Sequence, residues 1–292
     1  MRRIIAVLLF ILAVNVFGQE KSGISGSVEW DTMRINAQVS LDLASAGLRL
    51  PSGRTQAESL LASGFNDLIK GHLLDLQVDS SSTVADLLAR GELNYSAVES
   101  FTLTANSTAP SLSSDMRNIT ASHYIALSNI SSSLLRHNRP SPVTRTLSPV
   151  STAQYTGIII IAAESLPVHG MRGVALPVPC MFPKIWDSEM NLIYDQSMFD
   201  YQRSALRSMV HYSSLPNIFT NSPSGLSDEL KVIVGERPLR IFARGVFGIM
   251  PTDLIIDRND ALLIISSEEN RRLLSQGRVV FILDESVLRY KI

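Results

Sequence analysis

Strict alternation of apolar and polar residues defines the clearest predicted element of the chain. From Met33 to Leu43 every second residue is apolar, and the residues between them are polar or charged. Because successive side chains of a strand point to opposite faces of a sheet, this period of two predicts a long strand with one buried face. Residues 20–27 are rich in glycine and serine and are expected to form a polar leader before that strand.

The next segment has the period of a helix. Thr55 and Glu58 have the spacing of a capping box, which predicts the start of a helix. Thr83 and Asp86 predict the cap of a second, short helix that ends at Gly91. The first helix is expected to face a sheet with an apolar stripe made of Ala57, Leu60, Leu61, Phe65, Leu68, Ile69, Leu73 and Leu76.

Two more strands are expected, over residues 93–104 and 118–128, with a turn-rich stretch at residues 106–111 between them. The resulting order is strand, helix, helix, strand, strand. This order predicts an antiparallel sheet with both helices on one face. Residues 131–150, rich in serine and proline, have no periodicity and are expected to be an exposed linker.

Short strands dominate the second half. The β-branched run over residues 158–163 predicts a strand buried on both faces, and the four prolines from Pro167 to Pro183 indicate a structured loop. Helices are expected over residues 202–211, from a cap at Asn259 or Asp260, and over residues 267–274. The remaining strands are expected over residues 184–187, 191–194, 231–234, 239–246 and 278–284.

These patterns predict an α+β protein of two domains. The first is an α+β layer over residues 28–131, the second is β-rich and covers residues 152–292, and residues 132–151 form the linker rich in proline and serine. Residues 1–18 are expected to be a signal peptide.

A short apolar run at the start predicts export. Basic residues precede residues 4–17, and Val16 and Gly18 occupy the −3 and −1 positions before Gln19, so cleavage is expected between Gly18 and Gln19. The run is shorter than the roughly 20 apolar residues of a membrane span, and no later segment matches it. We therefore expect a periplasmic mature chain without an integral membrane span, with a retained signal anchor as the alternative. Gln19 stands where a lipoprotein has cysteine, which argues against a lipid anchor.

Composition excludes some functions. The 292 residues are 45% hydrophobic, enough for one or two cores, and a formal net charge of −1 provides no basic patch for nucleic acid or an anionic membrane. The single Cys180 cannot form an internal disulfide, and its apolar surroundings favour a buried, inert thiol over a reactive one.

Motifs for catalysis are missing. The chain has no phosphate-binding glycine loop, no nucleophile elbow and no zinc-protease motif, and Gly245 and Gly248 lack the third glycine of a dinucleotide fingerprint. We therefore predict no catalytic, cofactor-binding or metal-binding residues and no enzyme activity. Asp253, Asp257, Asp260 and Asp284 could be read as a carboxylate cluster, but helix capping by Asp257 or Asp260 is a better explanation than a metal or acid–base site. The histidines are scattered at His72, His123, His137, His169 and His211.

Several blocks of the second half resemble the FlgP family of exported flagellar assembly proteins. They begin with Tyr155-Thr156-Gly157 and the apolar run after it, and they follow the family's order through residues 183–187, 192–194, 237–248, 251–256, 260–261 and 277–284. The first half agrees in its element order, which resembles the family's SHS2-like or dodecin-like module. The resemblance implies a non-enzymatic, oligomeric protein associated with the periplasm or outer membrane and with motility. Unlike typical members, this chain has no lipobox cysteine, and it has Ala162-Ala163-Glu164-Ser165 in place of the usual Ala-Arg-Gly.

The first functional interpretation is an exported structural or assembly protein that forms homo-oligomers around the flagellar motor or cell envelope, with flagellar or envelope proteins as partners. Its candidate interface is the tight, proline-bearing turn at residues 248–253, represented by Gly248, Met250, Pro251 and Asp253. The alternative is a soluble periplasmic module that binds a small molecule or glycan through Phe182, Trp186 and Tyr194. An enzyme with an unfamiliar site is the third interpretation.

Overall fold

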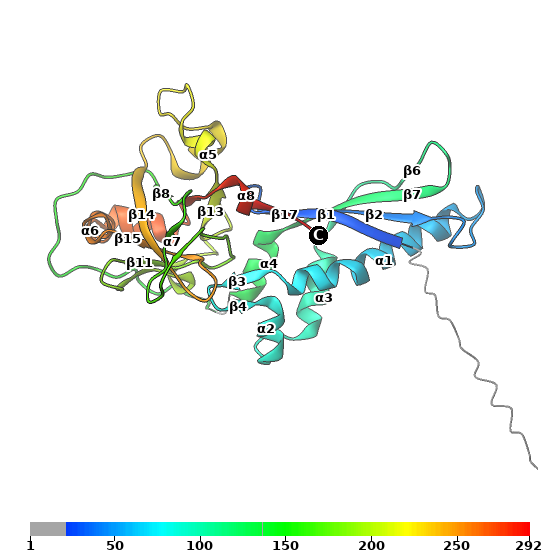
Figure 1. Cartoon of the computed structure of the whole chain (residues 1–292), viewed down its shortest axis with the longest axis horizontal. Coiled ribbons are helices and arrows are strands. Elements are labelled where there is room, and N and C mark those ends of the chain that lie inside the picture. The colour runs from blue at the N-terminus through cyan, green and yellow to red at the C-terminus, as the bar shows by residue number, and fades with distance from the viewer. Residues whose placement is uncertain (1–21, 136) are drawn as a thin grey trace, which may run out of the picture.

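The computed structural model describes residues 22–135 and 137–292, and it forms an elongated body of two joined parts (Figure 1). The predicted signal peptide and its cleavage site at Gly18 and Gln19 lie outside these residues. The predicted class, α+β with a β-rich C-terminal domain, is confirmed. In the described ranges, no helix combines the length and apolarity needed to cross a bilayer.

The first part is built on an antiparallel sheet with the strand order β17-β1-β2-β7-β5, and β6 also pairs with β7. The predicted strand at residues 33–43 is confirmed as β2, in which Ile35, Ala37, Val39 and Leu41 face the core. The expected leader at residues 20–27 is instead largely strand, because its small polar residues pair with β2 and leave one face open to solvent. The strands are β1 (Ser22–Glu29), β2 (Arg34–Asp42), β5 (Asn106–Ser107), β6 (Ser111–Leu112), β7 (Asn118–Ala126) and β17 (Arg289–Lys291).

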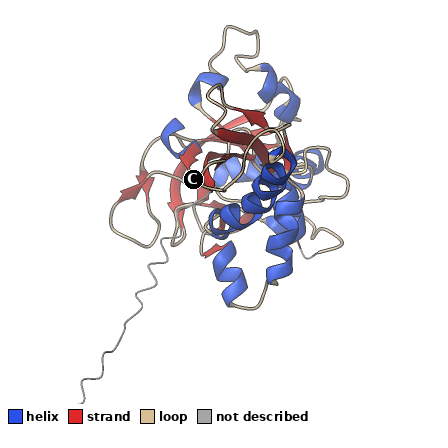
Figure 2. Ribbon diagram, turned by 90° about the vertical axis from the view of Figure 1, so that its right-hand side faces the viewer, coloured by secondary structure: helices blue, strands red, loops and turns tan. Residues whose placement is uncertain are grey.

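Helices cover one side of this sheet, as Figure 2 shows from the end of the molecule where the first part lies. Helix α1 packs on β1, β2 and β7, while α2 and α3 pack on α1. The stripe of α1 is confirmed at Ala57, Leu61, Phe65, Ile69 and Leu73, whereas Leu60 is 41% exposed. The four helices are α1 (Arg54–Leu74), α2 (Val84–Ala89), α3 (Tyr95–Leu103) and α4 (Leu127–Leu134).

Two further local predictions in this part were wrong. Helix α1 starts after Gly53 without a side-chain cap, and Glu58 pairs with Arg54 rather than closing a capping box with Thr55. The strand expected at residues 93–104 is helix α3, because Val98, Phe101 and Thr102 are buried together on one helical face. The capping box of Thr83 and Asp86 at the start of α2 is confirmed.

The second part contains a mixed, seven-stranded sheet in the order β12-β11-β15-β14-β8-β16-β13. The predicted buried strand is confirmed as β8, whose alternate residues enter two cores: Ile159 and Ile161 pack with α5, and Ile158 and Ile160 join the main core on the other face. The strands are β8 (Ile158–Ile161), β11 (Ile185–Asp187), β12 (Leu192–Tyr194), β13 (His211–Ser213), β14 (Leu239–Phe247), β15 (Asp253–Ile256) and β16 (Val279–Ile282).

The helices of the second part are α5 (Asp228–Val234), α6 (Arg258–Ile265), α7 (Glu268–Ser275) and α8 (Glu285–Leu288), with 3₁₀ turns η1 (Gln196–Met198) and η2 (Leu215–Ile218). The strand expected at residues 231–234 is the end of α5, which Ser227 caps, and the helix expected at residues 202–211 is a series of turns. Helix α6 is capped by Asp257 rather than by Asn259 or Asp260. The loop rich in proline carries the small hairpin of β9 (Leu166–Pro167) and β10 (Val174–Ala175).

One domain boundary differs from the sequence prediction. Strand β17, at the end of the range assigned to the second domain, returns to the first sheet and pairs antiparallel with β1. The backbone N–H of Trp30 also donates a 2.9 Å hydrogen bond to the carbonyl of Leu288. The chain therefore crosses between the two parts more than once. The two parts also share one continuous hydrophobic core.

Candidate functional site

The predicted interface turn is anchored to the first domain. It lies against the hairpin of β3 (Gln77–Asp79) and β4 (Ser82–Thr83), where the N–H of Met250 donates a 2.9 Å hydrogen bond to the carbonyl of Ser80. Gly248 has a φ of +116°, and a Cβ atom there would lie 2.4 Å from the Cβ of Ser80. Only glycine fits this close approach between the domains.

Asp253, at the end of the turn, has no exposed surface. Its carboxylate accepts hydrogen bonds from the backbone N–H of Lys184 at 3.1 Å, from Nε1 of Trp186 at 3.3 Å and from Oγ1 of Thr252 at 3.2 Å. Burial raises the pKa of Asp253, and these donors oppose that rise by stabilising the ionised form. Asp253 therefore fixes the end of the turn to the segment of Lys184 and Trp186.

The expected exposed interface is thus corrected. Gly248, Pro251 and Asp253 take part in contacts within the chain, since Pro251 also accepts a 3.0 Å hydrogen bond from the N–H of Val178. The exposed tip of the turn consists of Ile249, which is 78% exposed, and Met250, which is 41% exposed.

The aromatic surface expected for a glycan is not formed. Tyr194 is fully buried and donates its hydroxyl to the carbonyl of Met209, and the indole N–H of Trp186 is directed to Asp253. Phe182 is 3% exposed, but its ring lines a recess described below.

Cys180 is buried, as predicted. The hydroxyl of Tyr212 donates to the carbonyl of Cys180 at 2.7 Å and accepts from its N–H at 3.1 Å. Burial raises the pKa of the Cys180 thiol well above its usual range, which keeps it protonated and unreactive.

Two histidines, His123 and His211, have a buried Nε2 atom. His123, predicted on an apolar strand face, stacks on Phe65 with ring centroids 3.9 Å apart. Burial lowers the pKa of both His123 and His211, and the Nε2 atom of each is buried without a hydrogen-bond partner among the described residues. Within the same residues, no group of three histidine, cysteine or acidic side chains has the geometry of a metal site.

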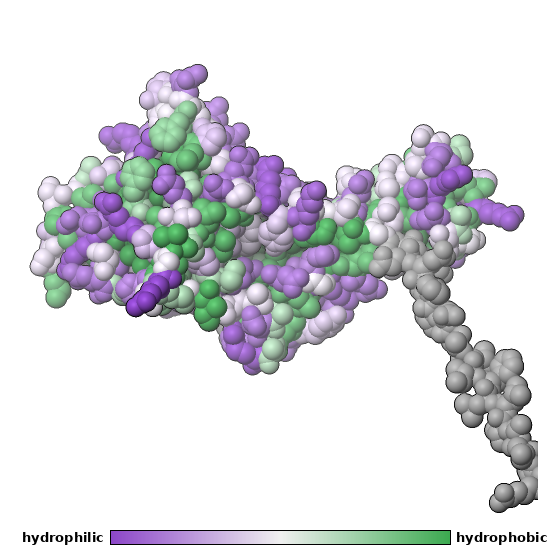
Figure 3. Space-filling model, viewed as in Figure 1, coloured by the Kyte–Doolittle hydropathy of each residue, from purple (hydrophilic) through white to green (hydrophobic). Residues whose placement is uncertain are grey.

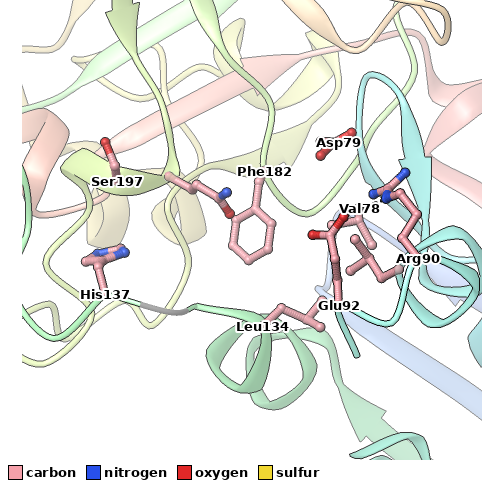
Figure 4. A pocket seen from close by; sticks show the side chains of 10 residues that line it. Val78, Asp79, Arg90, Glu92, Leu134, His137, Phe182 and Ser197 are labelled. Carbon is pink, nitrogen blue, oxygen red and sulfur yellow. Dashed lines mark hydrogen bonds and ion pairs between the residues drawn. The ribbon is translucent and has the colours of Figure 1, made fainter. Parts of the chain in front are cut away.

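A recess of about 320 Å³ lies where the two domains meet (Figure 4). Segment 181–182 runs beside β3, with hydrogen bonds from the N–H of Met181 to the carbonyl of Gln77 and from the N–H of Phe182 to that of Val78. This pairing places the Phe182 ring in the middle of the recess, between α2 and α4 on one side and η1 on the other. The recess is lined by Val78, Asp79, Leu87, Arg90, Glu92, Leu134, His137, Phe182, Gln196 and Ser197.

Charged groups occupy the rim. Nε of Arg90 lies 2.6 Å from a carboxylate oxygen of Glu92. Nη2 of Arg90 donates a hydrogen bond to Oγ of Ser82 at 2.9 Å. Oδ1 of Asp79 accepts hydrogen bonds from the N–H and the hydroxyl of Ser81. Sequence reasoning singled out only Phe182 of these residues as a recognition residue, because they come from separate segments that no local pattern connects.

The two parts of the chain match two family models. Residues 21–133 match the N-terminal domain of Treponema pallidum Tp0624, and residues 157–285 match the second domain of the same protein. No curated protein matches the chain. Neither match has a link to the FlgP family, so that resemblance stays a hypothesis.

Proposed function

From this two-domain architecture, which is similar to that of Tp0624, we propose that the chain is an exported, non-enzymatic structural protein of the bacterial cell envelope that acts by self-association. The observation that supports a structural role is the continuous core that joins the two domains, together with the return of β17 to the first sheet.

Rigidity distinguishes this proposal from a binding protein that closes around its ligand. Hinge closure needs a few residues that absorb the motion while the two domains separate. Three features join the two domains at the contact between them, which we call the seam: the buried Trp30, the Ser80–Met250 hydrogen bond and the β1–β17 pairing. Separating the domains at the seam would expose core residues and break backbone hydrogen bonds.

We expect copies to meet at the tip of the interface turn. Ile249 and Met250 present apolar side chains on a turn whose base is fixed by Gly248 and Asp253. On the face shown in Figure 3, apolar residues are interspersed with polar ones rather than gathered in one broad patch. A contact made only by the side chains at the tip of this turn would bury a small area. Because small interfaces are weak, we expect an oligomer that forms only as the protein concentration rises.

Light scattering after size exclusion, over a range of protein concentrations, tests this function. The wild-type chain should shift to a higher mass as its concentration rises, and Ile249→Asp should stay monomeric with an unchanged circular dichroism spectrum. Leu103→Asp is the matched control because Leu103 is 77% exposed at the end of α3. A wild-type monomer at every concentration would overturn self-association.

Export and the flagellar role need separate tests in the native host. Sequencing the N-terminus of the protein from the periplasmic fraction should find Gln19 first. A clean gene deletion should impair motility if the partners are flagellar; intact motility with a weakened envelope would leave the envelope role and remove the flagellar one.

A further inference from the structure

We propose that the recess around Phe182 binds a small organic cation that carries an ammonium group on an apolar body. This inference rests on the recess itself and is independent of self-association. Its volume of about 320 Å³ lies at the lower end of the range for small-molecule sites, and such sites occur preferentially at domain interfaces.

The floor of the recess is apolar. Val78, Leu87, Leu134 and Phe182 contribute to it from four separate segments, and the Phe182 ring projects between the two walls (Figure 4). Val78, Leu87 and Phe182 are nearly buried, and a hydrocarbon body would displace water mainly from the half-buried Leu134, which favours binding. The face of an aromatic ring also attracts a cation placed within about 6 Å of its centroid.

The carboxylate of Asp79 gives the rim a hydrogen-bond acceptor. Oδ1 of Asp79 is held by Ser81, while Oδ2 accepts from none of the described residues. Nε2 of His137 lies 2.9 Å from the carbonyl of Phe199. Since a carbonyl can only accept, Nε2 of His137 is the donor in this contact. A ligand that satisfies Oδ2 of Asp79 has to supply a donor.

The rim also has a net negative charge among its described residues. Arg90 is its one cationic side chain in that set, and Glu92 compensates it across a 2.6 Å contact, whereas Asp79 has no cationic partner. An ammonium group has three donors and a positive charge, and so matches both properties of the rim. A neutral alcohol matches only part of them, and a carboxylate matches neither.

Three probes with the same six-carbon chain separate the contribution of the ligand's charge from that of its apolar body: hexylamine, 1-hexanol and hexanoate. Titrations of the ¹⁵N-labelled protein at neutral pH should show that hexylamine binds about tenfold more tightly than 1-hexanol and that hexanoate does not bind. The shifted amide signals should belong to residues 78–92, Phe182 and residues 196–197.

Asp79→Asn tests the charge directly, because the amide oxygen can still accept from Ser81. This variant should bind hexylamine about tenfold more weakly and bind 1-hexanol unchanged. Asp67→Asn is the control, since the Asp67 side chain is 81% exposed on α1 and lines no part of the recess. If Asp79→Asn fails to fold, Glu92→Gln provides the second test with the same expected direction.

The proposal is overturned if hexylamine does not bind, if the three probes bind equally well, or if the charge-neutralising variants bind hexylamine as the wild type does. Selective loss of hexylamine binding in Asp79→Asn, with Asp67→Asn unchanged, supports it.

Discussion

The indole ring of Trp30 meets the phenol ring of Tyr212 edge to face, with centroids 5.8 Å apart and planes at 80°. Trp30 follows a strand of the first sheet, and Tyr212 lies in β13 of the second. Tyr212 in turn contacts Phe281 edge to face, so an aromatic series links the two sheets through the seam.

Trp30→Ala should therefore destabilise both domains. Trp30 is 1% exposed, and truncation of a buried tryptophan costs about 3–5 kcal/mol of unfolding free energy. Chemical denaturation measured by circular dichroism checks this value. Phe219→Ala, at a phenylalanine that is 69% exposed, should change stability by less than about 0.5 kcal/mol. Equal effects of the two substitutions would contradict the proposed seam.

Gly248→Ala should loosen the contact between the turn and Ser80. Gly91→Ala is the matched comparison, since both glycines have positive φ values but only Gly248 has another residue in the path of a Cβ atom. We expect Gly248→Ala to cost about 1–3 kcal/mol more than Gly91→Ala, because the new methyl group forces the two domains apart. Similar costs in thermal or chemical unfolding would mean that the turn is not fixed against the first domain.

Asp253→Ala should remove the organising acceptor of the junction. The N–H of Lys184 and Nε1 of Trp186 would lose their partner, at a cost of about 1–3 kcal/mol for each buried donor left unpaired. The indole fluorescence of Trp186 should change together with stability. A variant as stable as the wild type would show that water replaces the carboxylate without penalty.

His211 should make the fold sensitive to acid. Burial lowers the pKa of His211 from 6.5 to about 4. The residue as a whole retains some exposed surface, but its Nε2 atom is buried. Between these values the unfolded chain binds a proton that the folded chain does not, so stability falls as pH falls from about 6.5 to about 4. The full shift corresponds to a loss of about 3 kcal/mol. His211→Phe should flatten the pH dependence of the unfolding free energy in this range, and an unchanged slope would contradict the assignment.

Long, regular patterns predicted their elements well. In β2 the alternation extends over the whole strand and fixes which residues face the core, and in α1 the buried positions follow the predicted stripe. The short apolar runs at residues 93–104 and 231–234 do not distinguish a strand from a helix, because a few residues match either period. Both runs are helices that bury one face against a neighbour.

Contacts between distant segments were beyond the sequence patterns. Strand β17 is short and exposed, and it is a strand only because β1 offers its edge. The recess likewise forms when β3, α2, α4 and the loop of Phe182 come together, and of these segments only the loop of Phe182 has a sequence that suggests a binding site. The hydrogen bonds of the buried Asp253 depend in the same way on a distant segment, since Lys184 and Trp186 lie almost 70 residues before it in the chain.

The central claim is that the two domains form one rigid body, and the distance between two spin labels tests it most directly. Leu103→Cys and Val232→Cys place labels on exposed positions, one in each domain, while the native Cys180 is buried and should not react. Pulsed electron resonance on labelled protein diluted with unlabelled protein measures the distribution of that distance. A single narrow distribution is predicted; a broad or two-peaked one would show that the domains move relative to each other and would contradict the rigid structural role.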